Sequence, residues 1–436
     1  MNNTVESLRQ FRLAVYQTLW PSRDAAFDII DAIAASRDAR SAVEVSLSPT
    51  FQRSFASVYK GIQRTRIAEQ DLTRLLVEQA ESCGTLNFDG WALYALDHTP
   101  YPRQSAPTVS DRGYVHGADG VVIGHHYSLL GRVMYETGSW VGMVCCQRIA
   151  TYQTPSQVGA AQIERLKAHS NQPRIITADS EYVTDEILDQ ADETTRLLIR
   201  FRSNRKLFSA PEPRPDRARG RKPIHGQKIK LNQQDSLQQP QTSIRIDEAD
   251  GRCIEIGVWT GMHVESRPDI EVCAVRVEVF TPDKKPRYKR PLWLCWTGPA
   301  QMDWGEFWRV YLKRFCLECV HQFTKNSLAW TRGRFGYTGR EQRWTWLVML
   351  AYWQLLLAAP LARDLCRPWE KAKPDGELPT PGRVQREWVR LYREVGRVAR
   401  PPKVRGKGSG RAKGSRPPPR LRYEVVCKSQ KAIAES

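Results

Sequence analysis

The sequence contains little that would bind a structural metal or direct the chain into a secretory pathway. Its 10 cysteines are scattered, and the single C-x-x-C pair, Cys316 with Cys319, has no second pair and no histidine pair at ligand spacing. The first residues, MNNTVESLRQ, lack the basic and apolar regions of a secretory signal. We therefore expect a protein of the reducing cytoplasm whose cysteines are mostly buried thiols.

Long apolar runs are also scarce, and one stretch alone could mimic a membrane span. Residues 344–362 carry no charge, and this stretch is long enough for a transmembrane helix. It is isolated and contains Gln354 and Pro360, so we favour a helix buried in a large soluble core over a membrane helix. A chain of 436 residues exceeds the size of one hydrophobic core, and we expect two or three compact units.

Acidic side chains are in deficit, because 66 Lys and Arg face 47 Asp and Glu, which gives a net charge of +19. The surplus is concentrated in residues 200–230, with 11 basic side chains, and in residues 371–436, with 18. Two basic segments on a nearly neutral body suit contact with a nucleic-acid backbone, where each neutralised phosphate releases counterions. The alternative is a solvated surface with a disordered tail.

Hydrophobic periodicity divides the chain into five regions. Apolar spacing is helical over residues 1–88, and strand-like runs alternate with helical ones over 89–204. A β-rich stretch with a hairpin turn interrupts this alternation at 205–290, and helical runs follow a last strand over 291–366. Residues 367–436 are basic and contain a Pro- and Gly-rich segment that cannot form a core. The pattern predicts an α/β core in two parts with a β-rich insertion, an N-terminal α-helical domain and a basic, disordered C-terminal tail.

Two aspartates stand where apolar runs end. Asp97 closes the run YALD, and Asp179 closes the run RIITAD. Acids at the ends of strands lie at the edge of a sheet, where ligands commonly bind. An Asp at the end of a strand is also a common turn or cap residue, so neither one identifies a site by itself.

A third set of polar residues follows helical spacing. Tyr311, Arg314, Glu318 and Lys325 fall within an arc of roughly 60° if residues 304–328 form one helix. A carboxylate on that face could hold a divalent metal while the flanking cations bind phosphates, which suits phosphodiester chemistry. The alternative is a solvated helix face with an Arg–Glu ion pair.

This set resembles the YREK signature of bacterial insertion-sequence transposases of the DDE class. Asp97 and Asp179 are similar in order and context to the two upstream aspartates of that family, and 138 residues separate Asp179 from Glu318. That gap leaves room for a β-rich insertion before the third acid. The resemblance extends over residues 89–366 and implies a ribonuclease H-like catalytic core, with Asp97, Asp179 and Glu318 as the catalytic and metal-binding acids.

The resemblance also implies cofactors, partners and roles. Two Mg²⁺ ions, with Mn²⁺ as a substitute, would lie about 3.5–4 Å apart on the three acids, one activating a water or a 3′-hydroxyl and one stabilising the leaving oxygen. Arg314 and Lys325 would bind phosphates beside the scissile bond, and Tyr311 would position the backbone. The partner would be double-stranded DNA, as terminal inverted repeats and as target DNA, bound at the nucleoid by a homodimer.

The basic segment at residues 200–230 is a predicted DNA-tracking surface. Its members are Arg202, Arg205, Lys206, Arg219, Arg221 and Lys222. Trp259, Trp293 and Trp296 are weaker candidates for stacking on a base, because tryptophans in strands usually belong to the core. Two alternatives to a transposase stay open: a catalytically silent DNA-binding descendant of one, and a structure-selective nuclease that cuts without joining.

Overall fold

The computed structural model describes residues 2–117, 120–213, 220–403, 410, 412–416 and 418–427. The chain divides into two compact units, each built from segments that are distant in sequence. Unit 1 contains Met1–Thr85, His98–Thr154 and Cys316–Ser436, and unit 2 contains Leu86–Asp97 and Pro155–Phe315. The helices of the first segment share unit 1 with later strands and helices, so a separate N-terminal domain is not confirmed.

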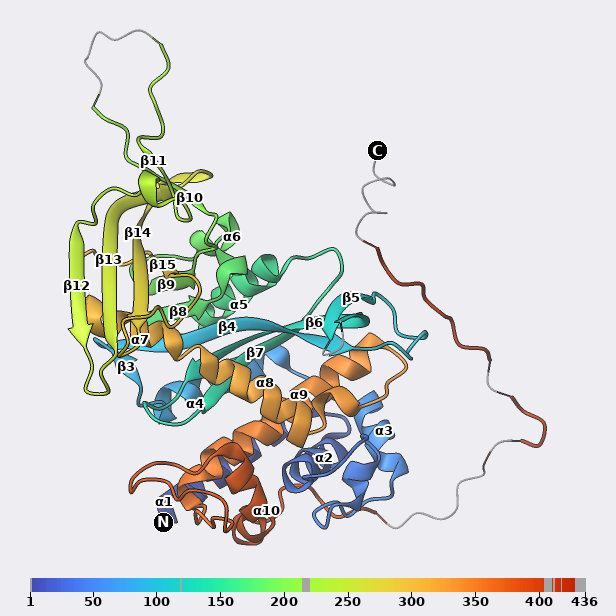
Figure 1. The fold of residues 1–436 in the computed structure, drawn as a ribbon. Coiled ribbons are helices and arrows are strands. Elements are labelled where there is room, and N and C mark those ends of the chain that lie inside the picture. The colour runs from blue at the N-terminus through green and yellow to red at the C-terminus, as the bar shows by residue number, and fades with distance from the viewer. Residues whose placement is uncertain are drawn as a thin grey trace. The chain divides into compact units, whose positions relative to one another are not determined.

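Unit 2 is a mixed β-sheet with helices packed on it (Figure 1). The strand order is β11-β10-β13-β14-β15-β9-β8-β4, with β12 beside β13 and β3 beside β4. β4, β8 and β9 are parallel to one another, and β9 is antiparallel to β15. The strands are β3 (Asn87–Phe88), β4 (Trp91–Pro102), β8 (Arg174–Ala178), β9 (Thr195–Arg200), β10 (Lys206–Ser209), β11 (Lys228–Lys230), β12 (Thr242–Asp247), β13 (Cys253–Val264), β14 (Arg267–Phe280) and β15 (Leu292–Trp296).

The parallel strands of unit 2 are apolar, as expected for strands covered on both faces. All five residues of β8 are buried. Helix α5 (Pro155–His169) lies against β4 at Gly159, where an added Cβ would stand 2.9 Å from Leu96 Cδ2, so only glycine permits this approach. Helix α6 (Asp185–Leu188) packs on α5, and helix α7 (Trp304–Leu312) contacts β12. The α/β alternation predicted for this part of the chain is therefore present.

The β-rich insertion extends this sheet. β12 and β13 form the predicted hairpin, and Gly251 at its turn has a φ of 82°, a conformation that favours glycine. β13 pairs with β14, and β14 pairs with β15 of the sheet, so residues 242–280 add strands to the sheet instead of forming one of their own. Side chains of β12 alternate between half-buried and exposed, as on an edge strand with one covered face.

Two histidines pack together inside the insertion. His263 on β13 is buried, its Nε2 lies 2.9 Å from Nδ1 of His225, and the ring of Phe208 packs against both. Burial, and then the neighbouring His225, lower the pKa of His263 below its ordinary value. The unfolded chain therefore binds this proton more readily than the folded one. The stability linked to neutral His263 is complete above about pH 6.5 and is lost as the pH falls from there through the lowered pKa of His263.

We expect His263 to make the stability of the full chain depend on pH. The free energy of unfolding of the wild type should fall more between about pH 7.5 and about pH 5.5 than that of His263→Gln. His116→Gln, which changes an exposed histidine on β5, is the matched control and should keep the wild-type difference. Equal pH dependence in the wild type and in His263→Gln would show that the pair does not couple protonation to folding.

Unit 1 packs helices around α9 (Thr338–Ala358), beside a small antiparallel sheet (Figure 1). The sheet consists of β5 (Gly113–Gly117), β6 (Gly120–Val133), β7 (Val141–Ile149) and the end of β4. Helices α1, α2, α3 and α10 contact α9, which also covers β7. The helices besides α9 are α1 (Asn2–Gln17), α2 (Arg23–Ala35), α3 (Ala56–Arg64), α4 (Glu69–Cys83), α8 (Phe315–Ser327) and α10 (Pro381–Val395), and β1 (Leu19–Trp20) pairs with β2 (Arg66–Ile67).

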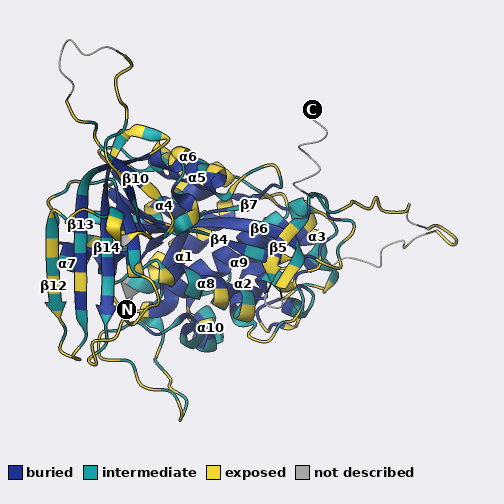
Figure 2. Cartoon of the chain, turned by 45° about the horizontal axis from the view of Figure 1, so that its top comes forward, coloured by how far each residue is buried: buried dark blue, intermediate teal, exposed yellow. Residues whose placement is uncertain are grey.

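Helix α9 forms the core of unit 1. By length and composition it could cross a membrane, but 89% of its most apolar window is buried inside the protein (Figure 2). Two of its indoles have internal partners: Trp353 donates from Nε1 to the carbonyl of Met143, and Trp344 donates to that of Trp330. This burial favours the interpretation of residues 344–362 as a core helix.

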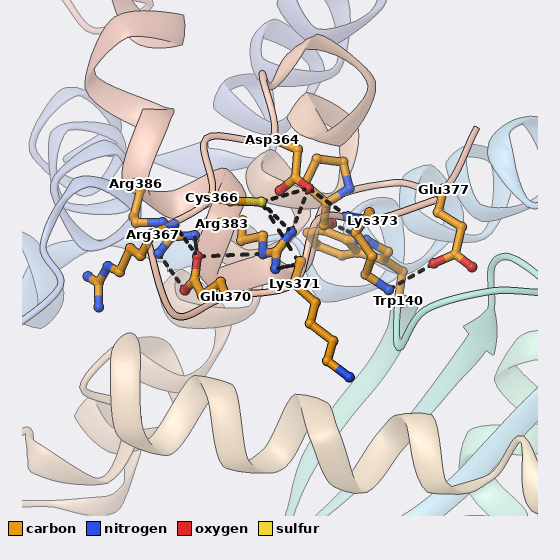
Figure 3. Close-up of polar contacts among 11 residues, drawn as sticks. Trp140, Asp364, Cys366, Arg367, Glu370, Lys371, Lys373, Glu377, Arg383 and Arg386 are labelled. Atoms are coloured by element: carbon orange, nitrogen blue, oxygen red, sulfur yellow. Dashed lines mark hydrogen bonds and ion pairs between the residues drawn. The ribbon is translucent and has the colours of Figure 1, made fainter. Parts of the chain in front are cut away.

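Part of the predicted basic tail is a folded helix, so the prediction that residues 367–436 are disordered is wrong for α10. Val384, Trp388, Leu391 and Val395 are buried at helical spacing against α9 and α2. The loop before α10 is fastened to it by ion pairs, with Arg383 on Asp364 at 2.5 Å and Arg386 on Glu370 at 2.7 Å (Figure 3). The many charged residues of this segment predicted a disordered tail, although its apolar residues recur with the period of a helix.

Candidate active site

Asp97 and Asp179 occupy equivalent positions on neighbouring parallel strands of unit 2. The register pairs Leu96 of β4 with Ala178 of β8, and the two aspartates are the next residues. Adjacent strands lie about 4.8 Å apart, so this register brings the two carboxylates to the same place in the sheet. β8 ends at Ala178, inside the strand predicted over 173–180, and β4 continues to Pro102, just beyond the strand predicted over 91–100. The expectation that Asp97 closes its strand is therefore wrong, because the apolar run ends there and the extended backbone does not.

Each carboxylate has a cation beside it. Arg314 Nη1 lies 3.4 Å from Asp97 Oδ2, and Arg200 Nη1 lies 3.9 Å from Asp179 Oδ1. Asp179 also accepts a hydrogen bond of 2.7 Å from the backbone N–H of Ser180. The Asp97 side chain is 16% exposed and that of Asp179 is 39% exposed. The two guanidinium groups offset the repulsion between neighbouring carboxylates.

The Tyr311 to Lys325 segment is not one helix. α7 ends at Leu312 and α8 begins at Phe315, so the predicted single helix over 304–328 is wrong. The N–H groups of Lys313 and Arg314 bond to the carbonyls of Val310 and Tyr311, three residues back, which tightens and ends α7. Arg314 consequently stands in the turn between the helices, where its side chain reaches Asp97.

Tyr311 belongs to the same cluster as the two aspartates. Its side chain is buried at the end of α7, with Arg314 Cζ 5.9 Å from the centre of its ring. Burial raises the pKa of Tyr311 to about 12, with Arg314 opposing the shift and Asp179 adding to it. The phenol is therefore protonated at neutral pH and can donate a hydrogen bond. Unit 2 thus brings together four predicted site residues, Asp97, Asp179, Tyr311 and Arg314.

Glu318 and Lys325 lie on α8 in unit 1. Lys325 Nζ donates to Thr99 Oγ1 at 2.5 Å, two residues beyond Asp97 along β4, and stands 5.9 Å from the centre of the Trp330 ring. Glu318 is half-buried in the first turn of the helix. The YREK set is therefore divided between the units, with Tyr311 and Arg314 in unit 2.

A basic hollow of about 780 Å³ opens next to Asp179 in unit 2. Its wall includes Ser180, the residue after Asp179, together with Trp293 and Asn232. Four arginines line it: Arg200, Arg202, Arg276 and Arg290. A second hollow of about 580 Å³ is lined by Arg202, Arg205 and Lys206. Three residues of the predicted DNA-tracking surface therefore border hollows in the unit that holds both aspartates.

The remaining members of that predicted surface lie farther along the chain. Arg221 and Lys222 are exposed, and Arg219 lies outside the described residues. The three tryptophans proposed as stacking candidates are buried, and Trp259 and Trp296 donate to the carbonyls of Gln238 and Pro299. Core packing accounts for all three, although Trp293 also forms part of the wall of the hollow beside Asp179.

Residues 15–253 match the family model described as DDE superfamily endonuclease, which is more than half of the chain. The chain belongs to this family. The matched DDE endonuclease region contains Asp97 and Asp179 and ends before the YREK set. No curated protein matches the sequence. Membership identifies a transposase-like nuclease that acts on DNA, and DDE endonucleases generally use divalent metals such as Mg²⁺.

The two aspartates of this DDE endonuclease fit a divalent cation. They offer carboxylate oxygens from neighbouring strands, which are the ligands that Mg²⁺ prefers. Across the part of the chain that the structure describes, no three His, Cys, Asp or Glu side chains gather as a metal-binding group. The two aspartates are therefore candidate ligands, and the sequence motif alone assigns a third acid, Glu318.

Sequence reasoning missed three of the arginines of the hollow beside Asp179. Arg200 ends β9 and faces Asp179, while Arg276 and Arg290 come from β14 and from the segment before β15. A signal for Arg200 existed, because it closes the apolar run RLLIR just as Asp179 closes RIITAD. Arg276 and Arg290 had no local signal, since only the pairing of β14 with β15 brings them near β9.

Proposed function

We propose that this DDE endonuclease is an insertion-sequence transposase that cuts DNA at the terminal inverted repeats of its own element and joins the ends to target DNA. The observation that carries the proposal is the register of β4 and β8, which places Asp97 and Asp179 at equivalent positions of adjacent strands. Paired carboxylates in a chain of this family are the donor set that metal-assisted phosphodiester chemistry needs.

Asp97 and Asp179 would hold Mg²⁺ together with Glu318, the third acid of the YREK set. When bound, Mg²⁺ activates the attacking oxygen and stabilises the leaving oxygen of the phosphodiester.

The basic groups of the cluster would position the strand that is cut. Arg314 stands beside Asp97, where its guanidinium can donate to a phosphate oxygen next to the scissile bond. Tyr311 stays protonated because of its raised pKa, so it donates to the DNA backbone and does not act as a base. Lys325 donates to Thr99 Oγ1, and its ammonium group would add positive charge beside the DNA backbone.

The hollow beside Asp179 would carry the flanking DNA. Arg200, Arg202 and Arg290 are contributed by two separated stretches of chain, so they can contact successive phosphates and not a single anion. Arg205 and Lys206 extend this basic path along the start of β10. Such contacts fix the position of the duplex without reading its sequence.

The test is an incubation of the full chain with DNA that carries its own element ends, with Mg²⁺ or with EDTA. Wild-type protein should cut at the ends and yield joined products in Mg²⁺ and should do neither in EDTA. Glu318→Gln should lose both products, because it removes an acid of the metal site. Glu394→Gln, which changes an exposed glutamate on α10, is the matched control and should cut like the wild type.

The products separate the proposal from its alternatives. Cleavage without joining would identify a structure-selective nuclease, and binding without cleavage in every protein would identify a catalytically silent descendant of a transposase. Normal cleavage by Glu318→Gln would remove Glu318 from the site.

A further inference from the structure

A second basic pocket, of about 530 Å³, lies in unit 1 on residues that the proposed active site does not use. Two loops form its walls: residues 102–108, which follow β4, and residues 331–336, which follow α8. Five arginines line it, Arg40, Arg103, Arg332, Arg334 and Arg420, and no acidic side chain is part of the lining. A pocket with this lining has a strongly positive potential.

The arginines of this pocket differ in their partners. Arg103 is buried and already compensated, because its Nε lies 2.5 Å from Glu341 Oε1, and it also donates to the carbonyl of Thr331. Among the described residues, the side chains of the other four arginines, Arg40, Arg332, Arg334 and Arg420, form no ion pair. Each of these four is exposed. The pocket therefore keeps four positive charges that the protein does not neutralise.

Arg420, the last of these arginines in the sequence, is held at the pocket by hydrogen bonds of the residues that follow it. The chain after Arg420 is anchored on the loop after β4, since Tyr423 N donates to the carbonyl of Pro107 and Val426 N to that of Arg112, both at 2.8 Å. Arg112 Nη2 returns a hydrogen bond of 3.0 Å to the carbonyl of Tyr423. This anchoring brings Arg420 against Gly336, where an added Cβ would stand 3.1 Å from Arg420 Nη1.

Polar groups of the same pocket complement the charges. Ser105, Thr108 and Gln104 supply hydroxyl and amide donors along one wall. Helix α9 begins at Thr338, two residues after Gly336, and its N-cap Tyr337 makes no side-chain capping bond. The dipole at the start of this helix adds further positive potential at the rim.

We infer that this pocket binds the phosphate backbone of duplex DNA, separately from the acids that would cut it. The inference rests on the proposed function, which makes DNA the polyanion that this protein meets, and deepens it by adding a contact surface in unit 1. The four arginines without an ion pair come from three segments that are far apart in sequence. This arrangement suits a run of phosphates better than one small anion. The proposed contacts are made to phosphates and not to bases, so the pocket binds DNA of any sequence.

The experiment measures binding alone. A fluorescent duplex of arbitrary sequence, about 30 base pairs long, is titrated with the full chain in EDTA at several salt concentrations. Each arginine–phosphate contact that is lost lowers the slope of log affinity against log salt by about 0.9. Arg332→Gln/Arg334→Gln should therefore lower the slope by about 1.8, which corresponds to a roughly 60-fold weaker affinity at 0.1 M salt if binding converges near 1 M.

Two variants make the test specific. Arg74→Gln/Arg393→Gln removes the same charge from exposed arginines of unit 1 outside the pocket, and it should leave the slope within about 0.3 of the wild type. Arg420→Gln alone should lower the slope by about 0.9, and it should fold like the wild type because Arg420 is exposed.

The outcomes separate this inference from the proposed function. Pocket variants that bind like the control would overturn the inference while wild-type cleavage still supports the transposase. A wild type that binds no duplex in EDTA would overturn both. Saturation of the pocket by inorganic pyrophosphate, with unchanged DNA slopes in the pocket variants, would assign it to a small anion and would also overturn the inference.

Discussion

Asp97→Asn should lower Mg²⁺-dependent DNA cleavage by about 10³-fold or more. A metal ligand at a phosphodiester supplies several kcal/mol of transition-state stabilisation, and about 4 kcal/mol corresponds to that factor. Asparagine has nearly the same size and keeps an oxygen that can accept from Arg314, whose Nη1 is 3.4 Å from Asp97 Oδ2. The variant should therefore fold normally and lose chemistry. The measurement is the initial rate of nicking at an element end, together with the thermal unfolding midpoint.

DNA binding distinguishes a folded but inactive Asp97→Asn protein from an unfolded one, because an unfolded variant would also lose affinity for DNA. Removing one negative charge next to the DNA should leave affinity unchanged or slightly increased, because less charge repels the phosphates. Asp283→Asn, in an exposed turn after β14, is the matched control and should cut and bind like the wild type. If Asp97→Asn cut normally while Asp179→Asn did not, Asp97 would be a structural residue of β4 and the paired-carboxylate site would be wrong.

The pairing of Asp97 with Asp179 could be predicted in part from the sequence. Both apolar runs that precede the aspartates are strands, and β8 begins one residue after and ends two residues before the predicted strand over 173–180. The register that aligns the two acids follows from the helix α5 crossover, which makes β4 and β8 parallel neighbours. The strand-like pattern over 91–100 predicted most of β4, whereas its pairing with β6 is a contact between distant segments that no local pattern indicates.

The break between α7 and α8 shows a different limit. No Pro or Gly marks residues 312–315, so the periodicity suggested a continuous helix. The turn there is accompanied by the contact of Arg314 with Asp97, which is 217 positions away in sequence. The sequence identified Tyr311, Arg314 and Asp179 as candidates. They come together at the turn after α7, and not on one face of a continuous helix as the spacing predicted.

Helix α10 was missed although its signal was present. Val384, Trp388, Leu391 and Val395 repeat at intervals of four and three residues, which is the period of a helix. Proline at its first position and Gly396 after its last turn are ordinary start and stop signals. The basic composition of the last 66 residues predicted a disordered tail. The spacing of the apolar residues predicted a helix, and the helix is what the structure contains.

Asp28→Asn should lower the free energy of unfolding by about 3–5 kcal/mol, the largest stability effect that we expect. The Asp28 side chain is completely buried on α2, and it binds Arg53 at 2.6 Å and Arg397 at 2.7 Å. Removing its charge leaves two guanidinium groups, at 14% and 15% exposure, without their counterion. Because Arg397 follows α10 directly, the same change weakens the attachment of α10 to α2. Urea unfolding followed by tryptophan fluorescence measures the loss.

Asp71→Asn is the control that tests whether burial causes this effect. Asp71 pairs with Arg74 at 3.2 Å, but the two side chains are 62% and 58% exposed, so water screens the attraction and the loss should stay below about 1 kcal/mol. Similar losses in both variants would mean that the Asp28 pairs are as weak as surface pairs. A large loss confined to Asp28→Asn would show that a buried carboxylate, and not the apolar stripe of α10 alone, stabilises unit 1.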